Sequence, residues 1–368
     1  MNFFELNRGV SKRVYNYFSY RSINNMYRRK IKELVHQHKC PPLSSSQLLE
    51  IKNYYNSFGL KGVNTDWHRF YTHMNGIFYK EYIPEDLFYS VIIDQLNMSN
   101  SHYSLTDKNL LSKFFHEIKQ PWTIVKNING TFCDEDNQLI LADKAFEICH
   151  RYSTMIVKPT LESGGGKNVV FFSLKDGMTD YKEMDLKGLL NYFDKNYIIQ
   201  EPVEQHEQMS LLNESSVNTI KFYTLLIDTD IEILIAFVRV GIPQSKLDNM
   251  NVGGIWCCVD EDGRLIDTGY DKDLTPFNRT GAGTILKGFQ VPNYHQMKEV
   301  VKNLHRRVPY FKIISWDLAI DKQGNPVLIE YNVRAPGIDF QAVTGPIFKS
   351  HTDQLLRACK FPVFFKKN

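Results

Sequence analysis

The chain has 368 residues, 43% of them hydrophobic and 23% charged, with a formal net charge of +3. This composition is typical of a globular protein that is long enough for two or three lobes. No run approaches the roughly 18 to 20 apolar residues that a membrane-spanning helix needs, and the first residues lack the apolar core of a secretory signal. Six scattered cysteines form no C-x-x-C pair, which indicates reduced, buried thiols rather than a zinc site.

Residues 1–39 carry an excess of positive charge. Nine Lys or Arg stand there against two Glu, so the rest of the chain is slightly acidic. Aromatic and basic residues follow one another at helical spacing, which predicts a basic helix. This helix either rests on an anionic membrane surface or a lipid-linked carrier, or packs on the main body with its charges in solvent. Nothing resembling a nucleic-acid-binding module follows, so we expect no nucleic-acid partner.

The segment after the basic helix contains a linker and an aromatic-rich stretch. Residues 40–46, Cys-Pro-Pro-Leu-Ser-Ser-Ser, have the composition of a linker. Residues 47–58 predict a helix, and residues 60–120 are rich in aromatic side chains. A further helix start is predicted at Thr106 or Asp107, because both residues are good N-caps.

A lysine ends an apolar strand at residues 155–158, and three consecutive glycines follow it. The glycines let backbone N–H groups approach a polyphosphate, and a buried Lys158 needs an anionic partner that a nucleotide phosphate would provide. The segment is not a P-loop, because Gly166-Lys167 is followed by Asn168. The alternatives are a simple hairpin turn and a lysine that reaches the surface. Lys126 ends a similar predicted strand.

Strands and helices alternate through the rest of the chain. The predicted strands are residues 123–125, 155–158, 169–173, 197–200, 217–227, 231–240 and 255–259. The predicted helices are residues 141–152, 185–193 and 293–308. Antiparallel pairs among these strands favour an α+β fold over a parallel, doubly wound sheet.

A polar hairpin near the C-terminal end brings oxygen ligands together. If its turn is centred between Gln323 and Gly324, Asp317 lies opposite Glu330, and Asn332 shares the face of Glu330. The opposite, apolar face is then lined by Trp316, Leu318, Ile320, Ile329 and Tyr331. Two facing carboxylates repel unless a cation lies between them. Such ligands suit Mg²⁺ or Mn²⁺ held together with substrate phosphates; the alternative is a surface hairpin whose acids face water.

In this order, the motifs resemble the sugar-transfer-associated family of the ATP-grasp superfamily, which is found among cell-surface polysaccharide genes. The matching segments are residues 121–130, 157–159, 200–206, 216–224, 251–255 and 316–332, within about residues 80–350. The resemblance implies an ATP-grasp fold of two α+β lobes that clasp ATP, behind a helical, aromatic-rich N-terminal extension. We expect a basic segment and linker at 1–45, an acceptor-side lobe at 46–120, a small ATP-grasp lobe at 121–205 and a core lobe with the metal site at 206–368.

The resemblance also implies roles for individual residues. The nucleotide would be bound by Lys126, Lys158, Ser163, Gly164, Gly165, Gly166, Gln200, Glu201, Val203 and Glu207. Within this set, Gln200 to Val203 would form the hinge that reads adenine, Glu207 would bind the ribose, and Lys126 would face either phosphate or acceptor. The cations near the transferred phosphate or a substrate carboxylate would be Lys221, Arg239 and Arg334. The metal ligands would be Asp317, Glu330 and Asn332.

The implied chemistry is phosphoryl transfer from ATP with Mg²⁺, or Mn²⁺, as the metal. The leading expectation is a carboxylate–amine ligase that works through an acylphosphate on a glycan or lipid-linked glycan precursor, in capsule or O-antigen biosynthesis or modification. The alternatives are a kinase that phosphorylates a sugar or lipid-linked hydroxyl, and a non-catalytic ATP-binding scaffold for glycosyltransferases. The expected location is cytoplasmic, at the inner face of the membrane if residues 1–39 bind it.

Overall fold

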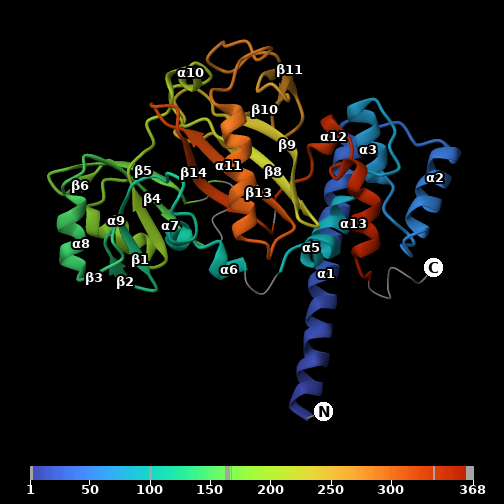
Figure 1. The fold of residues 1–368 in the computed structure, drawn as a ribbon, viewed down its shortest axis with the longest axis horizontal. Coiled ribbons are helices and arrows are strands. Elements are labelled where there is room, and N and C mark those ends of the chain that lie inside the picture. Colours follow the sequence, from blue (N-terminus) through green and yellow to red (C-terminus); the bar gives the residue numbers. More distant parts are fainter. Residues whose placement is uncertain (1–2, 99–101, 162–165, 167, 335, 362–368) are drawn as a thin grey trace. The chain divides into compact units, whose positions relative to one another are not determined.

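The polypeptide divides into two units, each built from segments that are separated in sequence (Figure 1). A computed structural model describes residues 3–98, 102–161, 166, 168–334 and 336–361, with side chains from residue 20 onward. Unit 1 comprises Met1–Ser99, Tyr310–Ile313 and Arg334–Asn368, and unit 2 comprises Asn100–Pro309 and Ile314–Val333. The division of the sequence into four consecutive parts stays a prediction.

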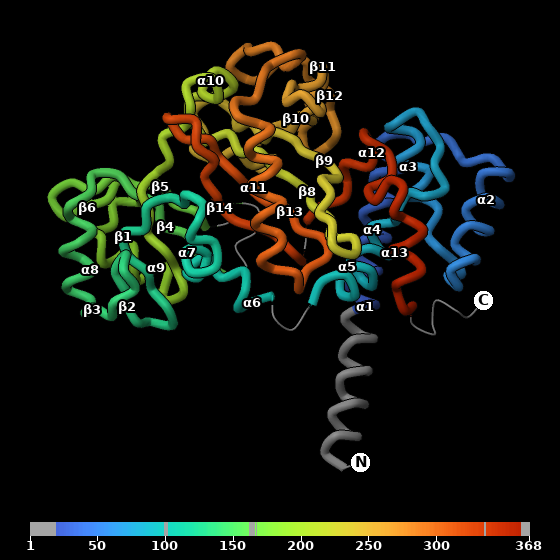
Figure 2. The backbone as a smooth tube through the Cα atoms, in the orientation of Figure 1, coloured from blue at the N-terminus to red at the C-terminus, as the bar shows by residue number. Residues whose placement is uncertain are grey.

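Unit 1 is helical. Its helices are α1 (Phe3–Gln37), α2 (Ser45–Asn56), α3 (Asp66–Asn75), α4 (Glu85–Leu87), η1 (Phe88–Ile92), α5 (Ile93–Leu96), α12 (Gln341–Thr344), η5 (Lys349–His351) and α13 (Thr352–Ala358). The linker ends in a capping box, because the Ser44 hydroxyl accepts a hydrogen bond from the backbone N–H of Gln47. The chain traced in Figure 2 returns at its red C-terminal end to the blue N-terminal helices, where α12 packs on α3. Within the described residues, no helix combines the length and hydrophobicity that crossing a membrane requires.

The aromatic residues counted in the sequence fill the interior of unit 1. Tyr27 of α1 stacks on Tyr89 with the ring centroids 4.7 Å apart, and it also contacts Trp67 of α3. Ile31, one helical turn further along α1, is fully buried. The C-terminal half of the predicted basic helix therefore packs on this unit along one side.

Unit 2 contains two seven-stranded sheets with antiparallel ladders. The strands of the first are β1 (Thr123–Ile128), β2 (Thr131–Cys133), β3 (Leu139–Ile140), β4 (Thr154–Pro159), β5 (Val170–Lys175), β6 (Met178–Thr179) and β7 (Tyr197–Gln200), in the order β3-β2-β1-β7-β4-β5-β6. Helices α8 (Ala142–Cys149) and α9 (Leu186–Phe193) supply apolar side chains to its core. Val125, Val157 and Ile199 form one row of that core, since both valines pair with Ile199. The next row, around Ile198, faces the other side.

The second sheet of unit 2 carries the predicted acidic hairpin. Its strands are β8 (Ile220–Ile227), β9 (Asp230–Val240), β10 (Ile255–Val259), β11 (Leu265–Tyr270), β12 (Pro276–Phe277), β13 (Ile313–Ile320) and β14 (Pro326–Asn332), in the order β12-β11-β10-β9-β8-β13-β14. The other elements of this unit are α6 (His102–Leu105), η2 (Lys108–Leu110), α7 (Leu111–Phe114), α10 (Glu207–Ser210), η4 (Met250–Val252) and α11 (Tyr294–Arg307).

Helix α11 covers one face of the second sheet, where it packs on β8 and β9 (Figure 1). Tyr294 of this helix stacks on Phe222 at 5.6 Å between centroids. On β13, Trp316 turns to the same side, and its indole N–H donates to the hydroxyl of Thr224 at 2.8 Å. Successive strand residues alternate between faces, so Asp317 points away from α11, toward the face on which the candidate site lies.

The α+β architecture confirms the predicted fold class. Strands β7 and β10 begin and end at the predicted residues. Strand β8 begins three residues later than predicted, at Ile220, because the side chain of Asn218 donates to the backbone carbonyls of Met209 and Asn213 in a loop. Of the two predicted helix starts, Asp107 is confirmed as the cap of η2. The six cysteines, all within the described residues, are buried free thiols.

Candidate active site

Two carboxylates face each other on neighbouring strands, as the sequence predicted. Asp317 of β13 pairs directly with Glu330 of β14. The buried Asp317 lies 2.5 Å from Lys221 Nζ through Oδ1 and 3.2 Å from Arg239 Nη2 through Oδ2. Glu330 Oε2 lies 3.0 Å from Lys108 Nζ. Cations from β8, β9 and η2 therefore offset the repulsion between the two acids.

Asn332 and Ser315 extend this polar row by one position. Asn332 Nδ2 is 3.5 Å from Glu330 Oε1, and Asn332 pairs with Ser315 across the ladder. Ser315 is fully buried, and its hydroxyl has no hydrogen-bond partner in the part of the chain that the structure describes. An unpaired buried hydroxyl is costly, so this oxygen has capacity for a bound group. Sequence reasoning overlooked Ser315.

Burial and charge act in opposite directions on the two acids. Burial alone would raise the pKa of Glu330, but the positive charges of Lys108, Lys221 and Lys158 lower that pKa well below its ordinary value. Burial raises the pKa of Asp317, although the two cations that touch it act in the opposite direction. Glu330 is therefore an ionised carboxylate across the neutral range.

Two buried lysines share one face of the first sheet. Lys126 of β1 and Lys158 of β4 both pair with Ile198 of β7, from opposite sides. Burial, reinforced by the positive charge of Lys108, lowers the pKa of Lys158 to about 8. Lys126 Nζ instead donates to Asn137 Oδ1 at 2.8 Å. The structure therefore brings Lys158 toward the carboxylates and gives Lys126 a protein partner.

A cavity of about 140 Å³ lies where these faces meet. Its apolar wall includes Ile156, Phe171, Val203, Val217, Leu247 and Ile329. Its polar wall includes Lys108, Lys158, Gln200, Glu201, Thr219, Arg239, Lys246, Asp248 and Glu330. An apolar half joined to a cationic half fits a flat base that carries phosphates.

Three predicted hinge residues, Gln200, Glu201 and Val203, line this cavity. The backbone N–H of Glu201 donates to the carbonyl of Trp122, which fixes the hinge beside β1. The predicted ribose ligand Glu207 is exposed at the start of α10 and is not among the lining residues.

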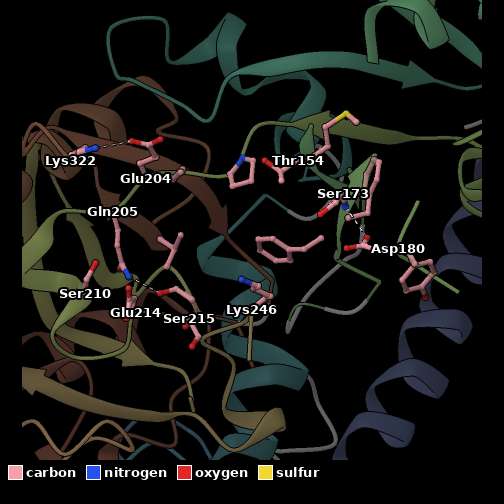
Figure 3. A pocket seen from close by; sticks show the side chains of 18 residues that line it. Thr154, Ser173, Asp180, Glu204, Gln205, Ser210, Glu214, Ser215, Lys246 and Lys322 are labelled. Atoms are coloured by element: carbon pink, nitrogen blue, oxygen red, sulfur yellow. Dashed lines mark hydrogen bonds and ion pairs between the residues drawn. The ribbon is translucent and has the colours of Figure 1, made fainter. Parts of the chain in front are cut away.

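A larger cavity, of about 690 Å³, adjoins the first one at the hinge (Figure 3). The two cavities share Phe171, Val203, Val217 and Lys246. An ion pair between Glu204 and Lys322, 3.5 Å apart, lies on the wall of the larger cavity. The two cavities therefore lie next to each other, with the four shared side chains between or beside them.

Ile329 lies on the cavity side of β14, where the sequence did not place it. Asp317 pairs with Glu330, whereas Leu318 pairs with Leu328, so a bulge leaves Ile329 without a directly opposite partner. Ile329 is half-buried and lines the cavity beside Glu330. The prediction that it faces the apolar side was wrong, because a bulge breaks the alternation of faces.

Arg239 is held by a hydrogen-bonded network. Its Nε and Nη2 atoms donate to the hydroxyl of Thr219 at 3.0 and 2.9 Å. Asp248 Oδ2 accepts from the backbone N–H of Thr219 at 3.1 Å and lies 3.5 Å from Arg239 Nε. Sequence reasoning missed Thr219, Asp248 and Lys108. The one available signal was Asp107, the helix cap that precedes Lys108.

A model of the family described as sugar-transfer associated ATP-grasp matches residues 89–355. The chain belongs to this ATP-grasp family. The matched range confirms the resemblance predicted over about residues 80–350, and with it the ATP-grasp fold. No curated protein matches the chain.

Solved structures of ATP-grasp proteins are similar to the chain at low identity. An L-amino acid ligase from Bacillus licheniformis is 14% identical with a TM-score of 0.39, and the match covers 69% of this chain and 48% of that one. The ATP-grasp ligase PsnB, complexed with a precursor variant, Mg and ADP, is 11% identical with a TM-score of 0.40, over 72% and 61% of the two chains. The D-cycloserine synthetase DcsG is 14% identical with a TM-score of 0.42, over 71% and 73%. The chain thus spans about half of the first ligase.

The remaining predicted residues of this ATP-grasp protein are one cavity-lining glycine, one arginine of unit 1 and three residues that lie outside the described residues. Ser163, Gly164 and Gly165 fall outside them. Gly166 lines the smaller cavity and has φ +68°, and a Cβ there would meet Asn249 Nδ2 at 3.2 Å, so a larger residue would be strained at this position. Arg334 belongs to unit 1, where it pairs with Asp94.

Metal-binding capacity at the ATP-grasp site rests on few protein ligands. Within the described residues, no group of three or more His, Cys, Asp or Glu is placed to hold a metal ion. The candidate set has two carboxylates and the amide of Asn332. Mg²⁺ typically takes one or two carboxylates and completes its shell with water and substrate phosphates.

Proposed function

We propose that this protein is an ATP- and Mg²⁺-dependent ligase that joins a carboxylate to an amine on a glycan or a lipid-linked glycan precursor. The observation that carries the proposal is the facing pair Asp317 and Glu330, set among Lys108, Lys158 and Arg239 beside the hinge cavity. Buried carboxylates and buried cations together suit a metal–polyphosphate complex, because each bound charge finds an opposite one.

ATP fits the composition of the cavity walls. The hinge backbone at Glu201 and Val203 would face the adenine edge, and Ile329 would pack on the base. Lys158 and Lys108 would contact phosphate oxygens, since both lie on the cationic side of the cavity. This assignment uses backbone groups for the base and charge for the phosphates, a division that suits a nucleotide.

Mg²⁺ fits the oxygen ligands of the hairpin. Asp317, Glu330 and Asn332 would hold it, with the buried hydroxyl of Ser315 adjacent. When bound, the ion neutralises charge on the phosphates. Mn²⁺ also accepts oxygen ligands and is the alternative ion.

The proposed reaction has two steps. An acceptor carboxylate oxygen attacks the γ-phosphorus of ATP, which forms an acylphosphate and releases ADP. An amine nitrogen then attacks the acyl carbon, which forms the amide bond, expels inorganic phosphate and releases a proton. Arg239, held by Thr219 and Asp248, would steady the transferred phosphoryl group, because a fixed guanidinium stabilises charge without reorganisation.

The sugar-transfer description of the family supports a glycan acceptor and a role in capsule or O-antigen biosynthesis or modification. The larger cavity of about 690 Å³ beside the hinge supports a bulky ligand. Lipid-linked precursors lie at the inner face of the membrane, so we also propose that the cytoplasmic enzyme contacts that face through residues 1–39.

Incubation with ATP, Mg²⁺, uronic acids and amino sugars tests the proposal. We expect release of ADP and phosphate together with a product whose mass is the sum of the two acceptors less water. A product that has gained a phosphoryl group would instead identify a kinase. Nucleotide binding without turnover, with a glycan phenotype that survives Asp317→Ala and Glu330→Ala together, would indicate a scaffold. Absence of ATP binding would contradict all three.

A further inference from the structure

The cations at the candidate site occupy the positions around the carboxylates that a metal ion would need. Lys221 Nζ lies 2.5 Å from Asp317, and Lys108 Nζ lies 3.0 Å from Glu330. Arg239 contacts the second oxygen of Asp317 at 3.2 Å. Each lysine side chain is only 10% exposed, so these are interior ion pairs and solvent screens them weakly.

The charges at the site disfavour binding of a metal ion without a nucleotide. Among Asp317, the side chains that pair with it and the described side chains that line the cavity, five are cations and four are acids. A divalent cation alone would add to this positive excess in a buried place, where unbalanced charge is expensive. A polyphosphate alone would reverse the excess. Only the two together leave the balance close to its starting value.

The two lysines can leave the carboxylates more readily than Arg239 can. A lysine carries its charge on a flexible four-carbon stem, whereas the guanidinium is a planar fork. Arg239 is further tied by two hydrogen bonds to Thr219 and by Asp248. Lys108 lines the cavity beside Lys158, so a small swing of its side chain exchanges a carboxylate for a phosphate.

We propose that Lys108 and Lys221 make metal binding conditional on nucleotide. In the free protein they hold Glu330 and Asp317 and exclude the metal ion. When a nucleotide binds, its phosphates draw the two amines away, and the carboxylates become ligands. The inference rests on the proposed nucleotide site and adds an order of events: metal enters with the nucleotide or after it.

Mn²⁺ binding, followed by electron paramagnetic resonance of the free ion, tests this without turnover. The full-length protein is titrated with Mn²⁺ alone and with Mn²⁺ plus a non-hydrolysable ATP analogue. We expect the analogue to raise the Mn²⁺ affinity by roughly 5- to 150-fold, the usual range for coupled sites. K108M and K221M should raise the affinity for Mn²⁺ alone within the same range, and the gain from the analogue should shrink.

K119M is the matched control. Lys119 pairs with Asp321 at 2.7 Å at the turn of the same hairpin, so its loss removes a Lys–Asp pair without opening the proposed site. We expect K119M to bind Mn²⁺ as the wild type does. Thermal unfolding shows which variants fold. If K221M does not fold, K108M alone tests the proposal, because its lysine is removed from a cavity wall.

Two results separate failure of this inference from failure of the proposed function. The proposal that lysines control metal binding is contradicted if the wild type binds Mn²⁺ equally well with and without the analogue. It is also contradicted if K108M and K221M bind Mn²⁺ as K119M does. If the analogue binds neither with nor without metal, the nucleotide site itself is wrong.

Discussion

Ile329 and Glu330 are consecutive in β14, yet both line the same cavity. The bulge beside Asp317 turns an apolar side chain and a carboxylate toward one cavity. In the proposed complex, Ile329 would cover the base while Glu330 would reach the metal. One irregularity in a two-stranded ladder thus brings both halves of the proposed nucleotide site onto one strand.

Ile329→Ala should weaken nucleotide binding with little effect on folding. The side chain is half-buried in the free protein, and losing its contact with a base costs about 1 kcal/mol, or roughly a fivefold loss of affinity. The control is Leu328→Ala on the neighbouring residue, which is fully buried. That change should cost about 2 to 5 kcal/mol of unfolding free energy. Isothermal titration and chemical denaturation measure the two effects, and an unchanged affinity for Ile329→Ala would show that the base lies elsewhere.

Glu330→Gln should remove the dependence of nucleotide binding on Mg²⁺. The amide keeps the shape of the side chain but loses the charge that holds Lys108 and would hold the ion. We expect at least a tenfold loss of affinity for the Mg²⁺–nucleotide complex, roughly the lower end of the effect of a metal-site change. The rise in melting temperature on adding ligand is the measurement. Glu207→Gln is the control, since the exposed Glu207 lies outside the cavity wall; an equal loss there would restore the predicted ribose contact.

Nucleotide affinity should fall as the pH rises above about 8. Burial lowers the pKa of Lys158 from 10.5 to about 8 in the free protein. A phosphate favours the charged amine, so binding raises this pKa and takes up a proton above pH 8. Below pH 8 the lysine is already protonated and affinity is highest; above it, affinity falls by up to about tenfold per pH unit. Titration calorimetry in buffers of different ionisation heat detects the proton uptake.

Lys158→Arg distinguishes this cause from a general effect of pH. The guanidinium stays charged across the range, so the slope above pH 8 should flatten. A slope equal to that of the wild type would mean that another group titrates.

The local sequence pattern was sufficient to predict the strands and the two facing acids. Strand β7 ends in Gln200 as predicted, and Asp317 meets Glu330, because apolar alternation and turn chemistry are local properties. The side of the sheet that Ile329 faces was predicted wrongly, because a bulge cannot be recognised from the alternation of residues in a short strand. Lys108 was missed for a different reason. It follows a helix cap in a one-turn helix, and only the tertiary fold places it beside Glu330.

The resemblance to the family indicated which motifs belong to one site, but it did not predict the position of every residue within those motifs. The resemblance implied that Glu207 binds the ribose, and the structure places it on the exposed start of α10 after the His206 cap. Arg334 follows Asn332 by only two residues, yet it belongs to unit 1, where it pairs with Asp94. Distance in sequence is a poor guide where the chain passes from one unit to the next.

The described part of α1 has two unlike faces. Ile31 is fully buried, Tyr27 stacks on Tyr89, and Lys30 forms an ion pair with the buried Glu85 at 2.7 Å. The opposite face exposes four cations that recur at helical spacing: Arg21, Arg28, Arg29 and Lys32. Removal of the first 40 residues would expose the core of unit 1, so truncation is a poor test of what these cations bind.

Replacing the four exposed cations by glutamine should reduce binding to anionic vesicles while unit 1 stays folded. Each cation near such a surface contributes about 1 kcal/mol, so four together correspond to a loss of roughly two to three orders of magnitude in partitioning. The control replaces four exposed lysines elsewhere in unit 1, Lys52, Lys61, Lys349 and Lys360, and changes the net charge equally. Sedimentation with neutral and anionic vesicles at low and high salt is the measurement, since screening should abolish a surface attraction. If the wild type stays in the supernatant with anionic vesicles, or if both quadruple variants lose binding alike, α1 has a structural role and its charges only face solvent.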